Sequence, residues 1–100
     1  MGYSVALSAR ATRTSTVAHI DIYLTTFCPY CVRARGLLDG KDVPYHVIDL
    51  AADPGRWEEM TRRSGRHTVP QVFIDEHHVG GYDDLSDLDR AGGLDPLLAR

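Results

Sequence analysis

Residues 19–40 read HIDIYLTTFCPYCVRARGLLDG, and they predict a strand followed at once by a helix. From His19 to Leu24, apolar side chains occupy every second position, which is the period of a strand. Pro29 suits the first turn of a helix, and apolar residues recur at helical spacing from there to about Asp39. The two cysteines of the chain therefore fall where this strand passes into this helix.

The rest of the chain predicts three more strands and three more helical segments. The strands are expected at 44–50, 71–75 and 77–79. A short helix is capped by Asp53, has Pro54 in its first turn and ends near Gly65. A second helix lies between Gly80-Gly81 and Gly92-Gly93, and a last helical turn starts at Asp95-Pro96. Strands joined through a helix run parallel, whereas the short connection after Asp75 forces an antiparallel pair. We therefore expect an α/β fold, with a four-stranded mixed sheet (βαβ, then αββα) flanked by helices.

The length and charge of the chain limit the kinds of protein it can be. One hundred residues are enough for one domain. The net charge is −3, so no basic field is available to attract nucleic acid. Nothing in the sequence approaches the roughly 18 consecutive apolar residues that cross a bilayer. We expect a monomer that binds neither nucleic acid nor membrane.

Residues 1–18 differ in composition from the rest of the chain. They are rich in Ser, Thr and Ala, hold Arg10 and Arg13, and contain no acidic residue. This composition fits a mitochondrial-type targeting peptide as well as a disordered extension, and we favour the extension. The expected domain is therefore residues 19–100. The expected location is the cytoplasm, with organellar targeting left open.

The two cysteines, Cys28 and Cys31, are separated by two residues. A disulfide between them would close a very short loop and remove little chain entropy, so reactivity explains the pair better than stability does. A four-cysteine zinc site would need a second pair, and neighbours such as His77 and His78 point to opposite faces of a strand. Unpaired N–H groups and the helix dipole favour a thiolate at a helix start. We expect Cys28 to attack and Cys31 to resolve.

Three motifs in order resemble those of dithiol glutaredoxins. They are Cys28-Pro29-Tyr30-Cys31, Thr68-Val69-Pro70 and Gly80-Gly81-Tyr82-Asp83-Asp84. The resemblance runs from about Ile20 to Arg100 and is especially close to bacterial members over 64–98. It implies a thioredoxin-like fold and a glutathione-dependent thiol–disulfide oxidoreductase that reduces protein disulfides and protein–glutathione mixed disulfides.

The resemblance implies that Pro70 follows a cis peptide bond. The Val69 backbone would then face the dithiol, and an extended thiol peptide could pair with it like an added strand. Tyr30, Thr68 and Val69 would flank the cysteinyl part of glutathione. Taken without the resemblance, Pro70 reads as an ordinary trans proline at the entrance to a strand.

The resemblance also gives the acidic motif a role in binding glutathione. The glycine pair lets the chain approach a ligand closely, and Asp83 and Asp84 would lie at a helix N-terminus that takes the γ-glutamyl carboxylate. Asp84 would pair with the α-ammonium group. By themselves these residues read as a turn followed by a capped, solvated helix start.

One position departs from the family pattern. Many glutaredoxins carry a Lys three residues before the first cysteine, where it helps to bind the glycine carboxylate of glutathione, and here that residue is Thr25. Arg66 or Arg56 is a candidate to replace this Lys.

Other functions remain open at this stage. The same fold serves redoxins fed by thioredoxin reductase, which do not need the glutathione contacts. Related proteins hold a [2Fe–2S] cluster between two chains, although Pro29 argues against this function because those proteins usually carry a smaller residue after the first cysteine. A zinc-binding interaction domain is the third alternative. We expect glutathione as co-substrate, no metal, and disulfide-containing or glutathionylated proteins as partners.

Overall fold

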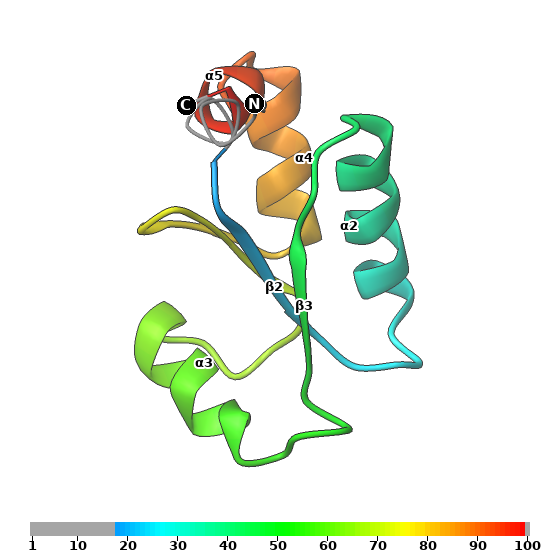
Figure 1. Ribbon diagram of the computed structural model, residues 1–100, viewed down its shortest axis with the longest axis vertical. Coiled ribbons are helices and arrows are strands. Elements are labelled where there is room, and N and C mark those ends of the chain that lie inside the picture. Colours follow the sequence, from blue (N-terminus) through cyan, green and yellow to red (C-terminus); the bar gives the residue numbers. More distant parts are fainter. Residues whose placement is uncertain (1–17, 100) are drawn as a thin grey trace, which may run out of the picture.

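A computed structural model describes residues 18–99 of the chain, which form a four-stranded sheet with helices on both faces (Figure 1). The elements in chain order are β2 (Ile20–Leu24), α2 (Pro29–Gly40), β3 (His46–Asp49), α3 (Arg56–Ser64), β4 (Gln71–Ile74), β5 (His77–Gly80), α4 (Tyr82–Arg90) and α5 (Leu94–Leu98). This order, and with it the α/β class, is the one predicted from the sequence.

The strands lie in the order β3-β2-β4-β5. Strand β3 pairs parallel to β2, since α2 carries the chain back between them, while β4 is antiparallel to both β2 and β5. Asp75 makes the tight turn between β4 and β5 with a positive φ of 53°. The mixed sheet is therefore confirmed. A short turn of residues 25–28 joins the carboxyl end of β2 to the helix that begins at Pro29.

Each face of the sheet carries its own apolar core because side chains alternate along a strand. Ile20, Ile22 and Leu24 of β2 pack with residues from α2, α4 and α5. Tyr23, on the opposite face of the same strand, packs with Phe73 of β4 and Met60 of α3. Figure 1 shows α3 on the opposite side of the sheet from α2 and α4.

Helix α3 begins later than the sequence predicts. The Asp53 side chain does not cap it. Instead, the Arg56 N–H bonds to the Asp53 carbonyl and the Trp57 N–H to the Pro54 carbonyl, and bonds between residues three apart form a turn rather than α-helix. The regular helix starts at Arg56, and its C-terminus falls at Gly65 as predicted, in the left-handed conformation with φ 73°. Similarly, α5 starts at Leu94, so that Asp95-Pro96 lies inside its first turn.

The first described residue, Ala18, belongs to the folded part of the chain. It is buried, and its N–H bonds to the Leu98 carbonyl at 3.3 Å. The rest of the expected extension, residues 1–17, lies outside the described residues. Within residues 18–99, no helix is long and apolar enough to cross a membrane.

Candidate active site at the start of α2

Cys28 occupies the N-cap position of α2. Its backbone is extended, with φ −114° and ψ 111°, and its Sγ accepts a hydrogen bond from the Cys31 N–H at 3.2 Å. Pro29 follows in the first turn, where its missing N–H costs no helical hydrogen bond. The sulfur therefore caps the helix as a side-chain oxygen does at other helix starts.

The two cysteines differ in burial and so in reactivity. Cys28 is partly exposed, whereas Cys31 is 2% exposed and packs in the core under α2. Burial, together with the hydrogen bond to Cys28, raises the pKa of the Cys31 thiol to about 12. Cys31 is thus a protonated thiol near neutral pH, and only Cys28 is open to an incoming disulfide.

The loop before β4 lies against Cys28. The Val69–Pro70 peptide bond is cis, and the Cys28 thiol donates to the Val69 carbonyl oxygen across 3.8 Å. Gln71 is fully buried, and its side-chain amide donates to the carbonyl and the hydroxyl of Thr68 at 3.1 and 3.3 Å. Sequence reasoning missed Gln71, although a polar residue opening the apolar run Val72-Phe73-Ile74 is a signal that could have found it.

Asp84 links the glycine pair to α4. Its Oδ2 accepts from the Gly81 N–H at 3.0 Å and from Arg66 Nη1 at 2.8 Å. The bond to Gly81 is the capping-box bond in which the side chain of the third helical residue accepts from the N-cap N–H. The Arg66 guanidinium, and after it the Gly81 N–H, lowers the pKa of the Asp84 carboxyl below its usual value. This carboxylate is therefore charged and held in one position.

A hollow of about 200 Å³ lies between these segments. Neither cysteine lines it, but residues of the other two motifs do, together with Tyr30 and Arg66: Tyr30, Arg66, Thr68, Val69, Pro70, Gly81, Tyr82, Asp83 and Asp84. Of the two arginines proposed to replace the missing Lys, Arg66 lines the hollow, whereas Arg56 pairs with Glu59 on α3. Thr25 lines a different hollow, beside Cys31 and Arg35.

Three exposed apolar side chains are neighbours of the cysteines in sequence. Phe27 is 96% exposed, Tyr30 51% and Val32 64%. These three residues flank or lie between the two cysteines in sequence, and we call them the apolar rim. Large exposed apolar side chains next to a reactive group indicate a surface that contacts other molecules.

Comparison with known proteins gives a consistent result. The family model for glutaredoxin matches residues 20–79. Glutaredoxin 3 of Escherichia coli K12 is 51% identical over 82 residues, which are 82% of this chain and 99% of that protein. A glutaredoxin of Pseudomonas aeruginosa is 50% identical over 80 residues, covering 80% and 95% of the two chains.

Solved structures agree with this match. The solution structure of a glutaredoxin from Brucella melitensis aligns with a TM-score of 0.74 at 46% identity, over 84% of this chain and 91% of that one. A crystal structure of a buckwheat glutaredoxin–glutathione complex aligns with a TM-score of 0.76 at 30% identity, over 88% and 83%. With the cysteine pair at a helix start and the cis-proline loop beside it, these matches make the chain a member of the glutaredoxin family and a thiol–disulfide oxidoreductase.

Proposed function

We propose that this protein uses glutathione to reduce protein disulfides and protein–glutathione mixed disulfides, with Cys28 as the nucleophile. One observation carries the proposal. The partly exposed Cys28 caps α2 and contacts Val69, which also lines the hollow with Asp84 and Arg66. The buckwheat relative, which forms a complex with glutathione, supports the choice of this tripeptide.

In the first reaction the Cys28 thiolate attacks the glutathione sulfur of a protein–glutathione mixed disulfide. A bond forms between Cys28 and glutathione, the old S–S bond breaks, and its electron pair leaves on the client sulfur, which takes a proton. The thiolate of a second glutathione then attacks the glutathionyl sulfur. This step releases oxidised glutathione and restores Cys28.

In the second reaction Cys28 attacks a client disulfide and forms a mixed disulfide with one client sulfur. Cys31 loses its proton and attacks Cys28 Sγ, so that the Cys28–Cys31 bond forms and the client leaves as a dithiol. Two glutathione molecules later reduce this bond. Since burial keeps Cys31 protonated, the order of attack is fixed: Cys28 first, Cys31 second.

The hollow supplies groups that match the tripeptide. The backbone of Val69 can pair with the cysteinyl backbone, while Thr68 and Tyr30 flank it. The γ-glutamyl carboxylate fits the N-terminus of α4, next to Asp83, and its α-ammonium group fits Asp84. Arg66 also lines the hollow, and it is the cation for the glycine carboxylate in place of the usual Lys if it leaves Asp84 when the α-ammonium group binds there.

A glutathione-coupled assay with the two cysteine variants tests the proposal. Cys28→Ser should lose the reduction of both substrates. Cys31→Ser should keep the reduction of a glutathione mixed disulfide and lose the reduction of a client disulfide. An inactive Cys31→Ser on the mixed disulfide would overturn the assignment of roles.

The same preparation separates the alternative functions. Turnover that depends on thioredoxin reductase, and not on glutathione, would replace the proposal with a thioredoxin-type activity. A coloured protein that contains iron and acid-labile sulfide would indicate a cluster-binding function. We propose a monomer in the cytoplasm, where glutathione is kept reduced, and sedimentation at micromolar concentration tests the monomer.

A further inference from the structure

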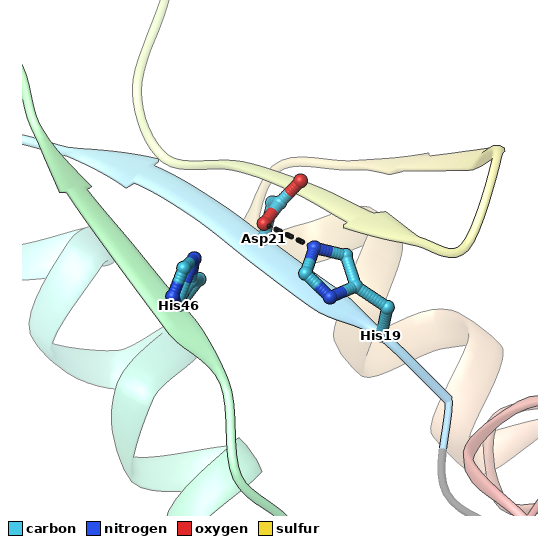
Figure 2. A group of neighbouring side chains, drawn as sticks. All are labelled: His19, Asp21 and His46. Carbon is cyan, nitrogen blue, oxygen red and sulfur yellow. Dashed lines mark ion pairs between the residues drawn. The ribbon is translucent and has the colours of Figure 1, made fainter. Parts of the chain in front are cut away.

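A second cluster of reactive side chains lies on the sheet, away from the cysteines. Among residues 18–99, the group that could hold a metal ion comprises His19, Asp21 and His46, whose candidate ligand atoms all lie within 4.8 Å of one another. Figure 2 shows Asp21 on β2, His46 alongside it on β3, and His19 just before β2. The cluster lies at the start of β2, and Cys28 follows the opposite end of that strand.

The pairing of the strands creates this cluster. In the parallel register Asp21 lies opposite His46, and paired residues project to the same face. His19 is two residues before Asp21 and therefore shares that face. Its backbone is fixed to the turn after β4: the His19 carbonyl accepts from the Asp75 N–H at 2.7 Å, and the His19 N–H donates to the Asp75 carboxylate at 3.0 Å.

The donor set suits a borderline divalent ion such as Zn²⁺. Two imidazoles and one carboxylate are ordinary zinc ligands at about 2.0–2.2 Å, and three protein ligands leave a fourth position for water. Two ligands at that distance are about 3.4 Å apart in a tetrahedral site. His19 Nε2 and Asp21 Oδ1 are 2.9 Å apart, so they need to separate slightly, and the exposed rings of His19 and His46 can move at little cost.

The surroundings orient the carboxylate. Asp21 is largely buried, with 13% of its side chain exposed, and its Oδ2 accepts from Arg63 Nη1 at 3.2 Å. Oδ1 is bonded to the His19 ring and so lies on the side of the imidazoles. The hydrogen bond from Arg63 is of the kind that holds a ligating carboxylate in place in metal sites. The positive charge of Arg63 repels a bound cation and so lowers the affinity for the metal, while its hydrogen bond fixes the orientation of the Asp21 carboxylate.

We propose that His19, Asp21 and His46 bind Zn²⁺ at a site separate from the dithiol. The ion lies between His19 Nε2 and Asp21 Oδ1 in place of their direct contact, and His46 closes the site from β3. Bound metal then ties the edge strand β3 to β2 and stabilises the fold, since it binds only where the two strands are paired. A hollow of about 200 Å³ beside both histidines leaves the remaining coordination position open to small ligands.

This site differs from the sequence expectation of no metal. His19 and His46 are 27 residues apart in sequence, and only the register of the two strands brings them together. The inference does not depend on the proposed reaction, because none of the three residues lines the hollow beside Cys28.

The test must exclude zinc binding by the cysteines. It therefore uses tag-free full-length protein carrying Cys28→Ser and Cys31→Ser, titrated with zinc chloride alone by calorimetry, and its melting temperature is followed in parallel. Variants His46→Ala and Asp21→Asn are made in this background. His77→Ala is the matched control, because His77 is an exposed strand histidine outside the cluster.

We expect one zinc ion per chain, and a rise in melting temperature of roughly 5–10 °C when free zinc is about tenfold above its dissociation constant. His46→Ala and Asp21→Asn should each weaken binding by at least about tenfold, while His77→Ala leaves it unchanged. NMR should show zinc-dependent shifts of the His19 and His46 ring signals. No binding to the cysteine-free protein, or equal binding by His46→Ala and His77→Ala, would overturn the proposal.

Discussion

Replacing Gly80 by Ala tests how the glycine pair holds the acidic group of the site. Gly80 has a φ of +119°, which L-residues rarely adopt. A Cβ built there would lie 2.3 Å from Asp84 Oδ2 and 2.8 Å from its Cγ. Because atoms cannot approach so closely, the Asp84 carboxylate would have to rotate away from the Gly81 N–H and from Arg66.

The cost of this change follows from the contacts that it breaks. Backbone strain at a positive φ costs roughly 1–3 kcal/mol. The lost capping bond to Gly81 adds about 1 kcal/mol, and the half-exposed pair with Arg66 adds less than about 1 kcal/mol. Gly80→Ala should therefore destabilise the protein by about 2–5 kcal/mol. If Asp84 binds the ammonium group of glutathione, the KM for glutathione should also rise about tenfold.

Urea unfolding of a double-mutant cycle with Asp84→Ala isolates the clash from the strain. In the Asp84→Ala background, Gly80→Ala should cost at least about 1 kcal/mol less than in the parent, because the carboxylate is gone. The matched control is Gly36→Ala in α2, where a Cβ meets nothing within 4 Å and the change should stabilise by about 0.5–1 kcal/mol. An equal cost of Gly80→Ala in both backgrounds would refute the reasoning.

Three further predictions concern the cysteines, the apolar rim and the acidic groups. In Cys28→Ser, iodoacetamide should modify Cys31 at pH 8 at least tenfold more slowly than in urea, since burial raises its pKa to about 12; equal rates would contradict this. Phe27→Ser should slow the reduction of a protein disulfide roughly three- to tenfold and leave a small mixed disulfide unaffected, whereas equal losses would mean that Phe27 supports the site itself. Hydrogen bonds, chiefly from arginine, lower the pKa values of the Asp84 and Glu59 carboxyl groups below their ordinary values of 3.8 and 4.5. The two carboxylates therefore stabilise the fold above these ordinary pKa values, and this stabilisation is lost as the pH falls through the lowered pKa values. Urea midpoints from pH 6 to 2 should fall less steeply in Asp84→Asn, and parallel curves would argue against this role.

Local sequence signals predicted most of the fold. The alternation of β2, the proline of α2 and the glycines after α4 each act within a few residues, so their effect can be read without a structure. The start of α3 could not be predicted in this way. Asp53 and Pro54 have the composition of a cap, but the chain makes one more tight turn there before regular helix begins at Arg56.

The long-range contacts of the site were less accessible to sequence reasoning. Nothing local distinguishes Arg66 from Arg56 as the cation nearest Asp84, because the two are told apart only by their partners in the fold: Arg66 pairs with Asp84, and Arg56 with Glu59 of α3. Gln71 bonds to Thr68, only three residues earlier, so this contact is local, and the polar residue at the start of the apolar run was its signal. The cluster of His19, Asp21 and His46 depends on one strand register, and a shift by one residue would place His46 on the other face.

The most direct test of the account is an NMR structure of Cys31→Ser carrying glutathione on Cys28 as a stable mixed disulfide. We predict contacts from the cysteinyl backbone to Val69 and from the γ-glutamyl group to Asp84 and the Gly81 N–H. Contacts confined to the other hollow, around Thr25 and Arg35, or a tripeptide without contacts beyond Cys28, would contradict it.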